Sequence, residues 1–119
     1  MSVVHVIESY VHNGRVAVLV ELSAESDYAL RTEEFRSVAR EVAMHIAAMS
    51  PPSVTSLIEQ PFVKDSSLSV GQLLANLSSS LREHISVTRF VRWDTANTQP
   101  AEPEPPKSPA IAMRNQLRA

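Results

Sequence analysis

Residues 3–22 read VVHVIESYVHNGRVAVLVEL, the most informative segment of the chain for its fold. Two runs rich in β-forming side chains, 3–12 and 15–22, flank the dipeptide Asn13-Gly14. Asn and Gly both tolerate a positive φ, so the pair favours a two-residue type I′ turn between antiparallel strands. The stretch therefore predicts a β-hairpin.

A two-residue turn also fixes which residues of the hairpin face each other. It places an almost wholly apolar set of side chains on one face and a mixed set on the other, which is typical of a sheet covered by helices on one side. The pairs on the apolar face are Val11 with Val16, Ser9 with Val18, Ile7 with Val20 and His5 with Leu22.

Two helices are predicted after the hairpin. Thr32 can cap the first helix, which Pro51-Pro52 end. Ser69 and Gln72 have the spacing of a capping box at the start of the second helix. A third β-rich run, from Ile85 to Trp93, then closes the folded part of the chain.

This order of elements predicts an α+β fold, in which a small three-stranded antiparallel sheet, with the hairpin first and the closing strand last, is backed by two helices. We expect the core to form where apolar side chains of the sheet meet the apolar stripes of the helices. Its predicted members are Val16, Val18, Val20, Leu22, Phe35, Val38, Val42, Leu73 and Leu77.

The chain has 119 residues, which is enough for one domain. We place this domain at residues 1–94, where all six aromatic residues lie. Residues 95–119 hold five of the eight prolines and too little apolar surface for a core. We therefore expect a proline-rich, mostly disordered tail, with a short helix after Ser108-Pro109.

Composition excludes several classes of protein. A net charge of -2 argues against direct binding of nucleic acid, and no apolar run is long enough to cross a membrane. The first residues lack the features of a signal peptide, so we expect a cytoplasmic location. The chain has no cysteine for disulfides or thiolate chemistry and only two glycines, too few for a phosphate-binding loop.

The sequence contains no spacing typical of catalysis or metal binding. The four histidines, His5, His12, His45 and His84, form no pair with ligand spacing, and no serine lies in a nucleophile elbow. We therefore expect no metal, no cofactor and no enzymatic activity. His45 flanks an apolar stripe and is predicted to be a partly buried packing residue.

The segment 23–31, between the second strand and the first helix, places the carboxylate of Asp27 beside the ring of Tyr28. Large apolar side chains are normally avoided on connections unless they dock on the core or on a partner. The pattern alone favours docking on the core over binding a partner.

Several motifs occur in the same order as in one known family. They include Gly14-Arg15-Val16, Arg31-Thr32-Glu33-Glu34-Phe35 and Ala43-Met44-His45-Ile46-Ala47-Ala48. Further on stand Leu57-Ile58-Glu59-Gln60-Pro61-Phe62-Val63-Lys64-Asp65 and Val70-Gly71-Gln72-Leu73-Leu74. Over residues 3–93 the chain resembles the core domain of bacterial elongation factor Ts.

The resemblance implies a guanine-nucleotide exchange factor of protein biosynthesis whose partner is the GTPase elongation factor Tu. The family's Thr-Asp-Phe-Val motif falls on Ser26-Asp27-Tyr28-Ala29, so the resemblance assigns to Asp27 and Tyr28 a wedge that enters the GTPase near its magnesium and phosphate site. Together with Arg31 these residues form the expected partner-binding set.

The resemblance also leaves alternatives open. The sequence opens at the core domain, so the amino-terminal helical module, the second core copy and the coiled-coil insertion of longer members are expected to be missing. Exchange activity is then expected to be reduced. The chain could instead be a non-catalytic dimerisation or assembly module, pairing as a homodimer, or a fragment whose missing module lies on a neighbouring reading frame.

Overall fold

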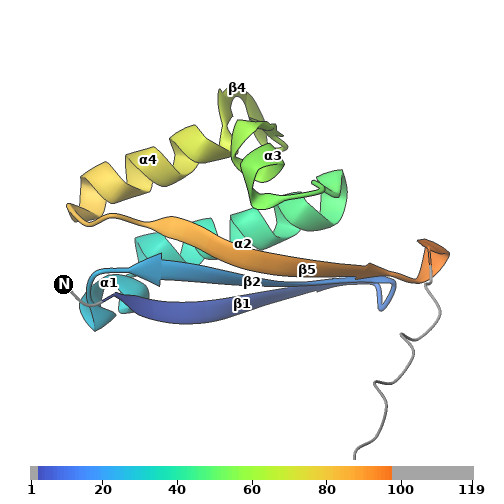
Figure 1. Ribbon diagram of the computed structural model, residues 1–119, viewed down its shortest axis with the longest axis horizontal. Coiled ribbons are helices and arrows are strands. Elements are labelled where there is room, and N and C mark those ends of the chain that lie inside the picture. Colours follow the sequence, from blue (N-terminus) through green and yellow to red (C-terminus); the bar gives the residue numbers. More distant parts are fainter. Residues whose placement is uncertain (1–2, 98–119) are drawn as a thin grey trace, which may run out of the picture.

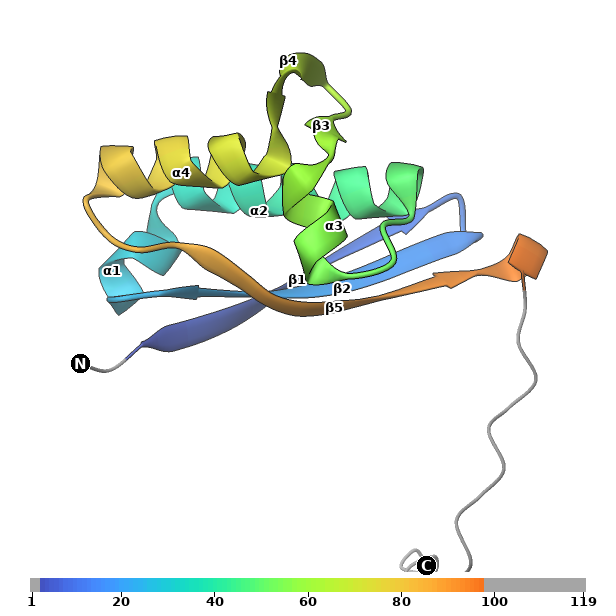
Figure 2. The same cartoon turned by 45° about the horizontal axis from the view of Figure 1, so that its top comes forward.

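The structure, a computed structural model, describes residues 3–97. Its main sheet is antiparallel and has the strand order β1 (Val4–His12), β2 (Val16–Ala24), β5 (Ser86–Asp94). The helices α2 (Glu33–Met49) and α4 (Val70–Leu81) lie on one side of this sheet (Figures 1 and 2). The predicted α+β architecture is confirmed.

The structure also contains short elements that the sequence pattern does not predict. Most are too short for a periodic pattern of apolar residues to form. They are α1 (Asp27–Arg31), α3 (Val54–Glu59), β3 (Pro61–Phe62), β4 (Asp65–Ser69) and the 3-10 helix η1 (Thr95–Asn97).

Both predicted helix starts are confirmed by their hydrogen bonds. The Thr32 side chain accepts a hydrogen bond from the backbone N–H of Phe35 at 3.1 Å. Ser69 and Gln72 exchange both hydrogen bonds of a capping box. Helix α2 ends at Met49, followed by Ser50 with a φ of 49° and then by the two prolines.

The core lies between the sheet and the helices. Of its nine predicted members, Val16 and Leu73 are only partly buried, and the others are buried. Helix α4 approaches α3 so closely that a Cβ on Gly71 would lie 2.9 Å from the carbonyl oxygen of Ile58. A glycine is therefore needed at this crossing.

The predicted register of the hairpin is wrong by one residue. Asn13 and Gly14 do take positive φ values of 54° and 67°, and the N–H of Arg15 donates to the His12 carbonyl at 2.9 Å. However, His12 pairs with Val16, which makes Arg15 an extra residue of the turn. The Arg15 carbonyl accepts a hydrogen bond from Thr95, beyond the end of β5, and this long-range contact accommodates the extra residue.

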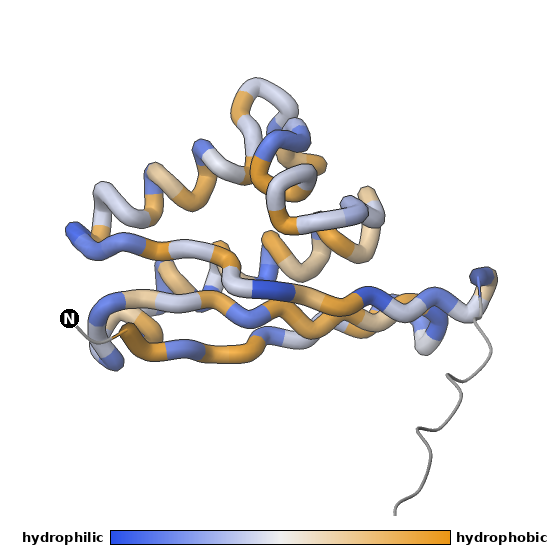
Figure 3. The backbone as a smooth tube through the Cα atoms, viewed as in Figure 1, coloured by the Kyte–Doolittle hydropathy of each residue, from blue (hydrophilic) through white to orange (hydrophobic). Residues whose placement is uncertain are grey.

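A shift of one residue moves every side chain of a strand to the other face of the sheet. Ile7 and Val11, which the sequence placed on the core face, are 58% and 63% exposed. The core face of β1 instead carries the partly buried Val4, Val6 and Tyr10. Figure 3 shows hydrophobic residues along all three strands. Because neighbouring residues of a strand point to opposite faces, adjacent apolar residues such as Val6 and Ile7 place apolar side chains on both faces of the sheet.

The predicted domain boundary after residue 94 remains a prediction. The structure continues into η1, where Ala96 donates to the Asp94 carboxylate. Residues 98–119, with most of the predicted tail and the helix predicted after Ser108-Pro109, lie outside the described residues. Among residues 3–97, no helix combines the length and apolar character needed to cross a membrane.

Candidate functional site

The short helix α1 is held at both ends by its own capping residues. The Ser26 hydroxyl accepts a hydrogen bond from the N–H of Ala29 at 3.2 Å. The Thr32 hydroxyl donates to the Ala29 carbonyl at 2.9 Å and also caps α2. Ala29 itself is buried in the core, so α1 is attached to the domain through its middle.

This attachment leaves the other predicted site residues on the surface. Asp27 and Arg31 are exposed, and Tyr28 is 71% exposed. The expectation from the pattern alone, that Tyr28 docks on the core, is wrong. Ser26 is partly buried and acts as the cap of α1, while the Ala29 side chain packs in the core, where a partner does not reach it.

A carboxylate from a distant segment holds the start of α1. Glu83 lies in the turn between α4 and β5, and its Oε1 accepts hydrogen bonds from the backbone N–H groups of Glu25 at 2.9 Å and Ser26 at 3.0 Å. Its Oε2 accepts from the Ser26 hydroxyl. In return, the Glu25 carboxylate accepts from the N–H of His84 at 2.8 Å. We call this reciprocal set the Glu83 clasp.

The clasp lowers the pKa of Glu83. The hydrogen bond from the Ser26 hydroxyl is the main cause, and the N–H groups of Glu25 and Ser26 act in the same direction, because all three favour the charged form. Burial raises the pKa and is second in size to the Ser26 hydroxyl bond, but the three hydrogen bonds together outweigh it.

We predict that the clasp loses its stabilising effect in acid. A group whose pKa is lowered by folding contributes stability above its ordinary pKa, here 4.5, and the contribution disappears as the pH falls through the lower value in the folded state. Glu83→Gln cannot titrate. The difference in melting temperature between the wild type and this variant should therefore shrink below pH 4.5, whereas exposed Glu59→Gln should show no such trend. A difference that stays constant with pH would contradict the prediction.

A second surface lies on the side of the sheet away from the helices. We call it the outer sheet face. Its large exposed apolar side chains come from all three strands: Ile7 and Val11 from β1, Leu19 from β2, and Val91 and Trp93 from β5. Trp93 is 78% exposed. An exposed apolar group of this kind is typical of a surface that binds another protein.

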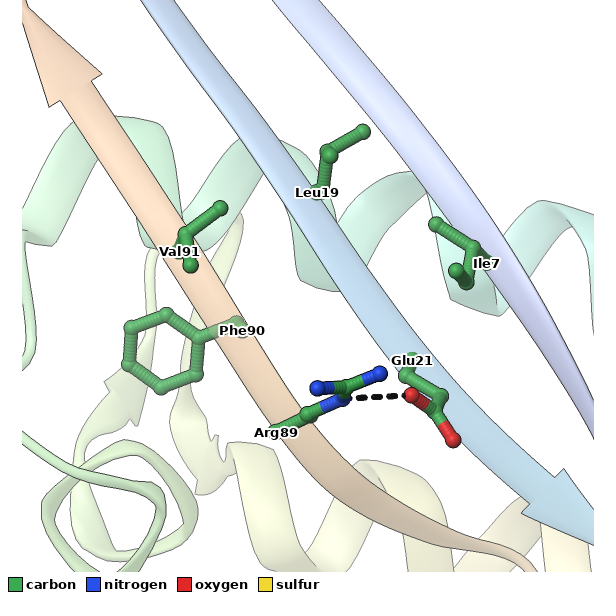
Figure 4. Close-up of a pocket in the computed structure, with 6 residues that line it drawn as sticks. All are labelled: Ile7, Leu19, Glu21, Arg89, Phe90 and Val91. Carbon is green, nitrogen blue, oxygen red and sulfur yellow. Dashed lines mark hydrogen bonds and ion pairs between the residues drawn. The ribbon is translucent and has the colours of Figure 1, made fainter. Parts of the chain in front are cut away.

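An open depression of about 210 Å³ lies on the outer sheet face, and Figure 4 shows Ile7 and Leu19 beside an ion pair there. Nε of Arg89 lies 2.6 Å from Oε1 of Glu21, and Nδ1 of His5 lies 3.0 Å from the other oxygen. The hydrogen bond from Arg89, and to a lesser degree the charge of His5, lowers the pKa of Glu21. The carboxylate of Glu21 at the border of the apolar surface is therefore already paired with Arg89 and His5.

The histidines do not converge on a metal-binding arrangement. No group of three His, Asp or Glu side chains in the part of the chain that the structure describes could hold a metal ion. His45 differs from its prediction, because it is fully buried rather than partly buried. Its Nε2 lies 2.8 Å from Oε1 of Gln60, its Nδ1 accepts from the N–H of Val63 at 3.1 Å, and its ring stacks on Phe62.

Sequence reasoning identified Asp27 and Tyr28 but missed Glu83 and Trp93. Glu83 gave no local signal, because its partners lie 57 and 58 positions away in the sequence. Trp93 was assigned to the closing strand without a face, because the register of β5 depends on its pairing with β2.

Comparisons with known proteins agree on one family. The family model described as Elongation factor TS matches residues 1–57. Elongation factor Ts of Rubrobacter xylanophilus is 33% identical, over 74% of this chain and 69% of the relative. The same-named proteins of Koribacter versatilis and Alkaliphilus oremlandii are 33% and 30% identical, over 71% and 74% of this chain.

The chain spans 60% of the Koribacter relative and 62% of the Alkaliphilus relative. The alignments run over 131 and 133 positions, which is more than the 119 residues of this chain. The relatives therefore carry additional residues inside the matched region.

Proposed function

The chain belongs to the elongation factor Ts family, and we therefore propose that it binds elongation factor Tu and promotes exchange of GDP for GTP. Exchange of this kind is an effect of binding, so the protein acts as a partner of the GTPase and not as an enzyme. We place this activity in the cytoplasm, without direct contact to nucleic acid or membrane.

The exposed pair Asp27 and Tyr28 on the anchored helix α1 is the observation that carries this proposal. A partner that binds the nucleotide-free GTPase more tightly than the nucleotide-bound one weakens nucleotide binding by the same factor. A carboxylate placed next to a magnesium ion competes with the oxygen ligands of that ion. An inserted ring displaces the surrounding side chains. Arg31, exposed at the end of α1, extends the contact.

The test is release of a fluorescent GDP from elongation factor Tu with and without this protein. We expect the protein to accelerate release and Asp27→Ala to reduce the acceleration. Glu59→Ala, which removes an exposed carboxylate from α3, is the matched control and should behave like the wild type. GDP release that is equally slow with and without the wild-type protein would exclude the exchange function.

The outer sheet face favours a second candidate function, assembly into a homodimer. We propose a second copy of this chain as its occupant, because Ile7, Leu19 and Val91 come from three adjacent strands and can meet their own copies across a two-fold axis. The paired Glu21 and Arg89 at the border leave no unpaired charge to be buried there.

We predict that Leu19→Glu abolishes this dimer. In a two-fold interface the substitution buries two unpaired carboxylates, so dimerisation should weaken by at least roughly a hundredfold. Sedimentation velocity measures the change. Met49→Glu, at an exposed apolar position at the end of α2, is the control and should leave the dimer intact. A wild-type protein that sediments as a monomer at high concentration would exclude the homodimer.

A further inference from the structure

In the proposed exchange function α1 presents Tyr28 to the GTPase, and Ala29 and Thr32 fix the middle and the end of this helix. The helix has five residues, fewer than an isolated helix needs for stability. Tyr28 is 71% exposed and so has few contacts of its own with the domain. The orientation of α1 at its start therefore depends on what holds the segment that leads into it.

Resting on this proposed function, we propose that Glu83 is the positioning residue of the Asp27–Tyr28 pair. Its two carboxylate oxygens bind three donors on the two residues that immediately precede Asp27. Two of these donors are consecutive backbone N–H groups, so the carboxylate restrains the backbone direction with which the chain enters α1. The third donor is the hydroxyl that caps α1.

The turn that carries Glu83 is itself well fixed. Arg82 ends α4 with a φ of 59°, and the N–H groups of Arg82 and Glu83 both donate to the Ser78 carbonyl. The N–H of His84 is bound by Glu25, and the N–H of Ile85 by the Ser78 hydroxyl at 3.0 Å. Every backbone N–H from Arg82 to Ile85 therefore has a partner.

A second contact ties the two segments together on the core side of the clasp. The hydroxyl groups of Ser23 in β2 and Ser86 in β5 lie 2.8 Å apart, and Ser23 is buried. The start of α1 is thus held between the sheet and the turn after α4. An orientation that is fixed before binding does not have to be ordered at the interface, so Glu83 raises the affinity for the GTPase without touching it.

The experiment is a double-mutant cycle of Glu83→Ala and Tyr28→Ala, read out as the GDP-release rate from elongation factor Tu at subsaturating protein. Glu83→Ala should slow accelerated release by roughly tenfold, because the segment must then be ordered on binding. In the Tyr28→Ala background the same substitution should have a much smaller effect. Glu83→Gln keeps an acceptor for the two N–H groups and should recover most of the rate.

Glu59→Ala is the control for the loss of an exposed carboxylate, and thermal melts show whether each variant is folded. Wild-type rates for folded Glu83→Ala would overturn the positioning role while leaving the exchange function intact. An equal effect in the presence and absence of Tyr28 would also overturn it, because Glu83 would then act through the general stability of the fold. If Glu83→Ala does not fold, Glu83→Asp decides by the same cycle, because its shorter side chain withdraws the carboxylate from the N–H groups of Glu25 and Ser26. Failure of the wild-type protein to accelerate GDP release is a different result, because it would exclude the exchange function and not only the positioning role of Glu83.

Discussion

Tyr28→Ala is expected to leave the domain folded and to weaken its complex with elongation factor Tu by about 2 kcal/mol or more, roughly thirtyfold in affinity. Buried aromatic anchors commonly account for this much binding energy, and Tyr28 is free to become one because it is largely exposed. For the same reason its removal leaves no cavity in the domain. Titration of the nucleotide-free GTPase gives the affinity, and a thermal melt gives the stability.

Tyr28→Phe is the matched control for this substitution. It keeps the ring and removes only the hydroxyl, so it should bind at least as well as the wild type if the ring is inserted into an apolar site. A Tyr28→Ala variant that binds like the wild type would mean that α1 is not the contact. A loss of about 3–5 kcal/mol in stability would mean that the ring is packed on the core in solution.

His45→Ala is expected to be the most destabilising of the proposed substitutions, by about 4 kcal/mol in the free energy of unfolding. The substitution empties a fully buried ring site beside Phe62 and leaves Gln60 and the N–H of Val63 without their partner. Both effects lower the free energy of unfolding. Chemical denaturation followed by circular dichroism measures the change.

His12→Ala is the control for His45→Ala. His12 lies at the exposed end of β1, and its ring nitrogens lie within hydrogen-bond distance of two local neighbours, Tyr10 and Asn13. We expect a change within about 0.5 kcal/mol, as for surface substitutions in general. Similar losses for both variants would show that the contacts of His45 with Gln60 and Val63 do not stabilise the fold.

The features predicted correctly from the sequence are those set by neighbouring residues. The caps at Thr32 and Ser69 involve hydrogen bonds over three positions, so their residue types can be recognised without knowing the fold. The positive φ of Asn13 and Gly14 is likewise local. The hairpin register was missed because Arg15 is accommodated as an extra residue by a contact with Thr95, which no local rule contains.

The same distinction applies to the candidate site. Asp27 and Tyr28 were recognised because an aromatic residue beside a carboxylate is unusual on a connection, and because of the family resemblance. Whether Tyr28 packed inward or outward depended on Ala29, which takes the buried position of α1. The role of Glu83 depended on bringing two turns together, which follows from the sheet and not from the sequence of either turn.

The strand order has a consequence for how the protein is made. β2 lies in the centre of the sheet, and its second neighbour, β5, begins only at Ser86. At roughly 5–20 residues per second, a ribosome needs several seconds to get from the end of β2 to β5. During that interval the main sheet consists of the β1–β2 hairpin, and β2 lacks its partner strand along one edge. A nascent chain that stalls before Ser86 therefore presents an unpaired edge of β2, which can pair with a strand of another chain or be bound by a chaperone.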